Sequence, residues 1–252
     1  MVATEVVMRI RRYRSDLPAD REAMRRIFRD TGLMGGPVTR YFPDADFMAD
    51  AMLSYYLRFE RDWALVAETA AVAGTGDDDG SRKGVAARDG AGAGAVVGYL
   101  TGCPSTVARN RISPLWLFPR VAVNFLRRGL LFTRAGFNLA WRGVPAYLAE
   151  LPVRAGLPPL GGFPAHLHMA VDPAYYRRGI GRRLLGAGLD RFREAGIRGV
   201  HVETSNKHPA AIALYAQAGF AEIGRHRTRF FDHMLPASEL PVETVLMARK
   251  LE

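Results

Sequence analysis

The chain has 252 residues, of which 48% are apolar, and this is enough to bury a sizeable hydrophobic core. That composition excludes a chain that is disordered throughout, and it favours one large domain or a domain with a large insertion. The only cysteine, Cys103, excludes an intramolecular disulfide, and the basic first residues lack the apolar run of a secretory signal. We therefore expect a cytoplasmic protein.

The formal net charge of +10 predicts an anionic partner but does not say which one. A basic surface attracts nucleic acid, anionic lipid and a polyanionic cofactor alike. Arginine greatly outnumbers lysine, and alanine and glycine are abundant, a pattern that coding bias also produces. Charge alone therefore does not choose among these partners.

The first part of the chain is predicted to form a strand and two helices. Residues Val6 to Tyr13 have the composition of a strand. Apolar residues recur at helical spacing from Asp16 to Met34, where Asp16 or Asp20 would be the N-cap, and again from Asp44 to Phe59. The expected order is strand, helix, helix.

Two short runs of β-branched and aromatic residues, Trp63 to Glu68 and Ala95 to Thr101, predict a β-hairpin. Between them, residues 74–94 are rich in Gly, Asp and Ala, so we expect a flexible loop. The Gly-Ala-Gly-Ala-Gly run of this loop precedes a strand instead of lying between a strand and a helix. It therefore does not predict a dinucleotide site.

Residues 105–163 are predicted to be an insertion that is largely helical. The part from Leu115 to Trp141 is amphipathic, and its prolines and arginines leave no uncharged run long enough to span a membrane. A Pro/Gly-rich run from Pro152 to Pro164 ends the insertion. It could be a substrate lid, a dimer surface or an interfacial membrane helix, and we favour a lid or a packing role.

The second half of the chain alternates strands with helices. The expected strands are His166–Val171, Gly199–Thr204, Phe220–Gly224 and Glu243–Lys250, and the expected helices are Gly179–Ala195 and Pro209–Ala218. Such alternation predicts an α/β fold, a sandwich of helices around a mixed, partly parallel sheet.

A glycine turn, Arg177-Arg178-Gly179-Ile180-Gly181-Arg182, lies between a predicted strand and an amphipathic helix. Glycines let the backbone approach a phosphate, a helix N-terminus presents unpaired N–H groups, and arginines add donors. The turn therefore predicts an anion site that would suit a pyrophosphate. Taken alone it is a weak signal, because many α/β turns need glycine for geometry only.

Two motifs together closely resemble the coenzyme A-binding core of GNAT acetyltransferases. The first, from Val171 to Leu185, reads Val-Asp-Pro-x-Tyr-Tyr-Arg-Arg-Gly-Ile-Gly-x-x-Leu-Leu, and the second, from Ala211 to Phe220, reads Ala-Ile-Ala-Leu-Tyr-x-x-x-Gly-Phe. The resemblance covers the second half of the chain, and the first half only by the order of its elements. It implies a single GNAT-like domain over 1–252, a three-layer sandwich that transfers the acetyl group of acetyl-coenzyme A to an amine.

The resemblance also implies where coenzyme A would bind. The strand before the glycine turn would lend backbone groups to the pantetheine arm, and the amides of the turn would hold the pyrophosphate. Tyr176 stands where the family usually has Gln or Arg, and His208 stands where it often has Asn, with Asn206 two residues earlier. The candidate cofactor-binding residues are Met169, Ala170, Val171, Tyr176, Arg177, Arg178, Gly179, Ile180, Gly181, Arg182, Asn206, His208 and Tyr215.

Direct attack by an amine on the thioester needs one group that accepts a proton and one that supplies a proton to the thiolate. The resemblance places Tyr215 near the thioester sulfur, and a phenol with a pKa of about 10 is matched to a thiolate with a pKa of about 8.5. Tyr215 is therefore the candidate general acid. The alternative is a core tyrosine that packs its helix against the sheet.

The general base has three candidates. His166 and His168 alternate on one strand and so share a face, and a similar His-x-His occurs on this strand in the arylalkylamine branch of the superfamily. Glu203 shares a face of the next strand with His201 and could instead bind a cationic substrate. The alternatives are histidines satisfied by local hydrogen bonds and a solvated or salt-bridged glutamate.

Two other functions remain open at this point. Residues Phe163 to His168 also resemble the acetyltransferase-like domain of some O-GlcNAc hydrolases and its free-standing bacterial relatives, which suggests a coenzyme A-binding module without catalysis. A nucleic-acid binder is disfavoured, because the arginines from Pro119 to Arg142 alternate with large apolar residues. The histidines lack metal-ligand spacing, so no metal is expected. The acceptor stays unidentified, and a homodimer is possible.

Overall fold

The computed structural model describes residues 8–69, 94–155 and 160–251, and the loop expected at 74–94 lies almost entirely outside them. Seven strands form one mixed sheet in the order β1-β2-β3-β4-β5-β7-β6. The strands are β1 Met8–Arg12, β2 Ala64–Thr69, β3 Val96–Cys103, β4 Ala165–Val171, β5 Gly199–Ser205, β6 Ala221–Arg227 and β7 Glu243–Lys250. Only the β4–β5 pair in this sheet is parallel. The partly parallel α/β fold expected from the sequence is confirmed.

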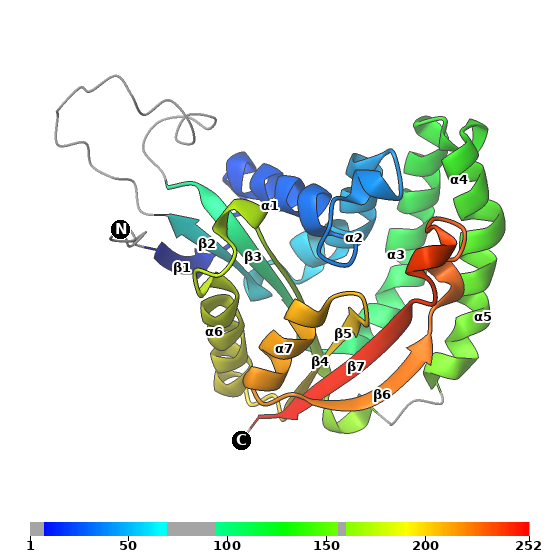
Figure 1. Ribbon diagram of the computed structural model, residues 1–252. Coiled ribbons are helices and arrows are strands. Elements are labelled where there is room, and N and C mark those ends of the chain that lie inside the picture. The colour runs from blue at the N-terminus through cyan, green and yellow to red at the C-terminus, as the bar shows by residue number, and fades with distance from the viewer. Residues whose placement is uncertain (1–7, 70–93, 156–159, 252) are drawn as a thin grey trace, which may run out of the picture.

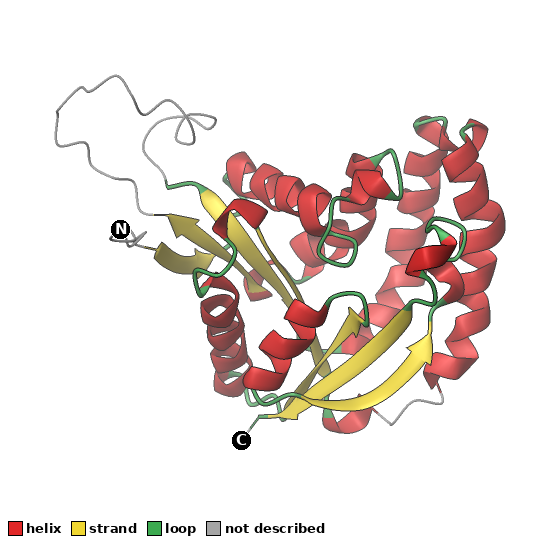
Figure 2. Ribbon diagram, viewed as in Figure 1, coloured by secondary structure: helices red, strands yellow, loops and turns green. Residues whose placement is uncertain are grey.

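Helices cover both faces of the sheet (Figure 2). The helices of the described residues are α1 Pro18–Thr31, α2 Ala45–Phe59, α3 Thr106–Arg127, α4 Arg134–Asn138, α5 Val144–Ala155, α6 Ile180–Glu194 and α7 Pro209–Gln217. On one face, α6 and α7 pack over a core that includes Leu184, Leu185 and Val200. On the other face, α1 and α2 pack over a second core that includes Ile27, Phe28 and Tyr99. The sheet therefore separates two apolar layers.

The two strands at the centre of the sheet pair over a very short stretch. The β4–β5 ladder contains only the pairs Ala165–Val200 and His166–His201, although both strands continue well beyond them. Each strand keeps its outer partner, since β4 pairs with β3 up to Val171 and β5 pairs with β7 up to Ser205. Beyond His166, the edge of β4 that faces β5 therefore has no partner among the described strands.

The described residues of the 105–163 segment form helices at the end of the molecule far from β1 (Figure 1). α3 runs out from the body, a turn at 128–133 reverses the chain, and α4 and α5 run back, joined by a π-helical segment, Leu139–Gly143. Glu150 of α5 accepts hydrogen bonds from the backbone N–H groups of Arg229 and Phe230, which ties the returning helix to the segment after β6. Within the described part of the chain, no helix is long and apolar enough to cross a membrane.

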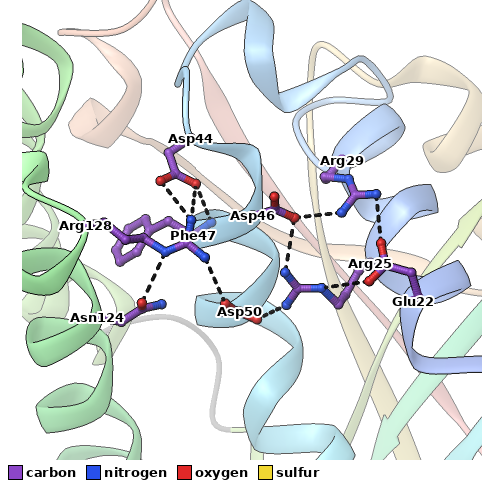
Figure 3. Close-up of polar contacts among 9 residues, drawn as sticks. All are labelled: Glu22, Arg25, Arg29, Asp44, Asp46, Phe47, Asp50, Asn124 and Arg128. Carbon is purple, nitrogen blue, oxygen red and sulfur yellow. Dashed lines mark hydrogen bonds and ion pairs between the residues drawn. The ribbon is translucent and has the colours of Figure 1, made fainter. Parts of the chain in front are cut away.

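Ion pairs connect α1, α2 and α3 (Figure 3). Arg29 of α1 lies 2.6 Å from Asp46 of α2, and the arginine holds the pKa of that carboxyl below its usual value. Arg128, just after α3, lies 2.9 Å from Asp44, whose side chain also caps α2 by accepting from the N–H of Phe47. These contacts fix α3 relative to the helices that cover the sheet.

The expected N-cap of α1 is wrong. The helix begins at Pro18 after Leu17, with no side-chain capping bond, because proline at the first position already fixes the helical φ and has no N–H to satisfy. Asp20 instead lies inside the first turn and is buried, where it pairs with Arg11 at 2.6 Å and accepts from the N–H of Arg14 at 3.0 Å. Its carboxylate joins α1 to β1.

Removing the Asp20 carboxylate should destabilise the fold. We expect Asp20→Ala to lower the free energy of unfolding by about 3 kcal/mol, because the substitution removes one of the two carboxylates that pair with the largely buried Arg11 guanidinium and leaves only Glu68. Chemical denaturation of the purified protein measures this change. Asp16→Ala is the matched control, since Asp16 pairs with Arg14 on the surface and its loss should hardly move the transition. Equal losses in the two variants would contradict this account.

Candidate active site

The glycine turn leads directly into the N-terminus of α6. Gly179 is the N-cap residue and has φ = +75°, a left-handed conformation that glycine adopts without strain, and Arg177 has φ = +61°. Before the turn, the Asp172 side chain accepts from the N–H of Ala174 at 3.0 Å and pairs with Arg26 of α1 at 2.6 Å. The end of β4 and the start of α6 are therefore held in a fixed geometry.

The first turn of α6 lies between β4 and α7. A Cβ added to Gly181 would come 3.2 Å from the Leu214 side chain and 3.6 Å from that of Met169, so the backbone approaches both elements closely at this point. Around it, Arg177, Arg178 and Arg182 are exposed, and Arg182 donates to Gln217 at 2.7 Å. The free N–H groups of the helix start and these guanidinium groups suit a pyrophosphate.

Tyr215 of α7 lies in the core on the same side of the sheet as α6. Its side chain is 6% exposed, and its ring centroid is 5.5 Å from that of Phe220. Burial raises the pKa of the Tyr215 phenol above its usual value of 10. The hydroxyl therefore stays protonated throughout the physiological range and can act as a hydrogen-bond donor.

His166 lies on the opposite face of the sheet, in a chain of hydrogen bonds. Its Nε2 is 2.9 Å from the Tyr56 hydroxyl and its Nδ1 is 2.7 Å from the Thr106 hydroxyl, which donates to the Pro164 carbonyl at 3.0 Å. Because Thr106 donates to Pro164, it accepts from Nδ1–H, and Nε2 then accepts from Tyr56. Burial and the nearby Arg109 hold the pKa of His166 well below its usual range.

His168 shares this face, two residues further along β4. Its ring lies 6.1 Å from the Phe28 ring and 5.7 Å from the Tyr99 ring, with Nδ1 3.5 Å from the Tyr99 hydroxyl. Burial lowers the pKa of His168 to about 4. The alternation expected along β4 is confirmed, since Leu167 and Met169 belong to the core under α6. Both histidines are neutral at pH 7.

Glu203 stands on β5 on the same face as His201, and His201 pairs with His166 across the β4–β5 ladder. The His166 and His201 rings are 5.6 Å apart, and Nδ1 of His201 is 2.8 Å from the Phe163 carbonyl oxygen. Burial raises the pKa of Tyr56 to about 12, and the charge of Glu203 is among the smaller contributions. The exposed Glu203 side chain therefore lies near the Tyr56–His166 pair.

The sequence did not predict the residues of α2 and α3 that surround His166. The helical spacing of Tyr56 predicts only that this side chain is buried, and nothing in the sequence singles out Thr106 or Arg109. The Arg109 guanidinium lies 5.7 Å from the centre of the Tyr56 ring, and its buried Nε has no hydrogen-bond partner within the described part of the chain. Behind them, burial raises the pKa of the Cys103 thiol to about 12, so the thiol stays protonated.

The structure places the remaining candidates at or beyond the edge of the site. Tyr176, next to the glycine turn, is 46% exposed. Asn206 accepts from the N–H of Glu243 at 3.0 Å and thereby fixes the end of β5. The His208 ring packs so closely under Gly35 that a Cβ there would come within 2.6 Å of Nε2. Among the described residues, no group of three His, Cys, Asp or Glu side chains is arranged to hold a metal ion.

The low pKa of His168 makes stability depend on pH. In the unfolded state, the His168 imidazole has its ordinary pKa of 6.5 and binds a proton below that pH, whereas in the folded state it binds one only below about pH 4. The free energy of unfolding therefore falls as the pH falls from 6.5 to 4. We expect the protonation of His168 in the unfolded state to reduce the free energy of unfolding by about 2 kcal/mol between pH 7 and pH 5. Denaturation at both pH values should show this loss in the wild type and a smaller one in His168→Gln. An equal loss in the two proteins would contradict it.

Comparison with known proteins agrees with this geometry. The model of the acetyltransferase (GNAT) family matches residues 153–220. The N-alpha-acetyltransferase RimI of Mycobacterium tuberculosis is 44% identical over 77 residues, which cover 29% of this chain and 47% of the relative. The chain thus spans about half the length, or less, of the first curated relatives that it matches.

Solved structures match over almost the whole chain. The structure of SsHAT aligns with a TM-score of 0.64 at 24% identity and covers 97% of this chain and 98% of its own. A GNAT superfamily phosphinothricin acetyltransferase from Sinorhizobium meliloti, solved with acetyl-coenzyme A, aligns with a TM-score of 0.50 at 16% identity and covers 97% of this chain and 88% of its own. At these identities the structures show the fold. The match to the acetyltransferase (GNAT) family covers the glycine turn, and the fold of the whole chain is similar to that of these structures.

Proposed function

We propose that the protein is an N-acetyltransferase that transfers the acetyl group of acetyl-coenzyme A to an amine by direct attack. The observation that carries this proposal is the early end of the β4–β5 ladder beside the glycine turn. It leaves an unpaired strand edge next to an anion site on one face of the sheet. On the other face, it leaves a group of neutral polar side chains around His166.

The glycine turn and the free edge of β4 would bind different parts of coenzyme A. The amides of Gly179, Ile180, Gly181 and Arg182 would hold the pyrophosphate, with the exposed arginines Arg177 and Arg178 neutralising its charge. The edge of β4 from Met169 through Ala170 to Val171 would pair with the amide groups of the pantetheine arm, as a strand would. This arrangement directs the thioester toward the point where β4 and β5 separate.

The reaction forms a carbon–nitrogen bond and breaks the carbon–sulfur bond of the thioester. Tyr215, the candidate acid, would donate a hydrogen bond from its phenol to the departing thiolate, which leaves as an anion. Its raised pKa means that it is protonated before the reaction and acts as a hydrogen-bond donor to the sulfur as negative charge develops there. The proton lost by the amine must leave on the other face of the sheet.

The Tyr56–His166 pair is the base that the geometry supports best. The amine would pass its proton to the Tyr56 oxygen while the Tyr56 hydroxyl proton moves to Nε2 of His166, 2.9 Å away. Among the residues that the structure describes, His168 has no such partner at short range, since its contact with Tyr99 is 3.5 Å. The exposed Glu203 is the alternative base, or would instead attract a cationic acceptor toward the pair.

The acceptor is an amine of a small molecule or of a protein. Because this chain spans only about half of its Mycobacterium tuberculosis relative, the acceptor that this relative's name describes does not transfer to it. We take residues 1–252 as a single GNAT-like domain with an insertion at 105–163, whose described residues are largely helical. A cytoplasmic location, where acetyl-coenzyme A is available, and a possible homodimer belong to the same proposal.

Acetyl-coenzyme A binding tests the proposal directly. We expect titration calorimetry to show binding that Gly181→Glu abolishes, because a carboxylate there repels the pyrophosphate and crowds Met169 and Leu214. Gly186→Glu, in the middle of the same helix and with open space around its Cβ, is the matched control and should bind normally. No binding by the wild type would refute the proposed function. Binding without thiol release over an amine panel would favour the non-catalytic coenzyme A module.

Substitutions on the two faces should separate the acid from the base. With an amine that is turned over, we expect Tyr215→Phe and His166→Gln each to lower kcat about 100-fold or more while the Kd for acetyl-coenzyme A stays unchanged. Glu203→Gln should raise KM more than it lowers kcat if Glu203 attracts the acceptor. The reverse pattern, a large fall in kcat for Glu203→Gln and little effect of His166→Gln, would assign the base to Glu203.

A further inference from the structure

The turn between α3 and α4 forms the tip of a helical hairpin beside α2 (Figure 1), and large apolar side chains are exposed there. Phe132 is 91% exposed, Trp141 73% and Leu126 59%. We call the exposed apolar residues of this region, with the exposed arginines between them, the tip patch. It consists of Val123, Leu126, Leu131, Phe132, Phe137 and Trp141 with Arg127, Arg134 and Arg142.

The tip patch belongs to an ordered turn. Leu130 is 4% exposed and anchors the turn in the core under α1 and α2. Thr133 caps α4 by accepting from the N–H of Gly136 at 3.0 Å, and the Phe137 and Trp141 rings stack 5.9 Å apart. The exposed apolar groups are therefore presented in a fixed arrangement, although none of them contributes to the core of the chain.

The charge around the tip patch has one sign. From Pro104 to Ala149 the sequence contains seven arginines and no Asp, Glu or Lys, so this hairpin carries most of the formal net charge of +10. Of these arginines, Arg128 pairs with Asp44, while Arg127, Arg134 and Arg142 are exposed and alternate in the sequence with the exposed apolar residues. A partner that covers the patch must accept large apolar side chains and a dense positive charge at the same time.

We propose that the tip patch docks on the surface of a membrane that contains anionic lipid. Phenylalanine, leucine and tryptophan side chains enter the boundary between head groups and acyl chains, and arginines beside them pair with lipid phosphates. The ordered turn carries both kinds of group, so the hairpin inserts its tip without unfolding. This contact is peripheral and involves no helix that spans the bilayer.

Charge disfavours a second copy of the chain on this surface, and the aliphatic side chains disfavour nucleic acid. A second copy of the chain, placed against the patch by a two-fold axis, would bring two such basic hairpins together, and like charges oppose that contact. Nucleic acid would satisfy the arginines but would leave aliphatic groups such as Leu126 and Leu131 without a matching surface. An anionic lipid surface matches both the apolar groups and the charge.

Vesicle flotation tests this inference with the intact protein. We expect binding to vesicles of equal parts phosphatidylcholine and phosphatidylglycerol, and little binding to phosphatidylcholine alone. Phe132→Ser should weaken binding about tenfold, because the variant loses the free energy that the exposed Phe132 ring gains when lipid buries it. Arg127→Gln and Arg134→Gln should each weaken it about fivefold, and added salt should weaken it further.

Matched substitutions elsewhere on the surface serve as controls. Met52→Ser removes an exposed apolar side chain of α2, and Arg21→Gln removes an exposed arginine of α1, so neither should change vesicle binding. The inference is overturned if the wild type ignores anionic vesicles or if Phe132→Ser binds them equally well. If the wild type forms a dimer that Phe132→Ser dissociates, the patch belongs to a second copy of the chain. If the wild type binds a single-stranded oligonucleotide that Phe132→Ser does not bind, the patch belongs to nucleic acid. Because vesicle binding needs no acetyl-coenzyme A, failure here leaves the proposed function intact.

Discussion

The parallel pairing of β4 and β5 stops at His166 and His201, and the rest of the candidate site depends on that early end. A continuous ladder would satisfy the inner edge of β4 and would close the sheet between its two apolar layers. Because each strand keeps its outer partner instead, the sheet stays intact while its centre opens. The start of α6 then meets the open edge on one face, and the Tyr56–His166 pair meets it on the other.

Local sequence signals predicted the parts of this arrangement that depend on backbone geometry. The glycine at 179 is needed for a positive φ at the helix start, so the turn could be recognised and placed before α6 without any tertiary information. The alternation of His166 and His168 with apolar residues likewise fixed their shared face, because strand periodicity is a local property. Such features need no knowledge of which distant elements pack nearby.

The partners of these residues could not be predicted in the same way. His166 is bonded by Tyr56 and Thr106, which lie 110 and 60 residues before it in the sequence. Nothing in the spacing of apolar residues in α2 distinguishes Tyr56 from an ordinary core tyrosine. Likewise, nothing in the sequence of the insertion around Thr106 indicates that it contacts β4. The predicted N-cap of α1 was wrong for a related reason. Asp20 pairs with Arg11 of the neighbouring strand β1 and does not cap its own helix.

The titratable groups around the opening share one electrostatic property, which bears on how an amine could react there. Burial lowers the pKa of both histidines of β4 and raises the pKa of Tyr56 and of Tyr215, so each of these four side chains is neutral at pH 7. An environment that disfavours these charges disfavours an ammonium ion as well. Entry into the site would therefore lower the pKa of the acceptor itself, and a neutral histidine of low basicity then suffices, because much of the work of deprotonation is done by desolvation.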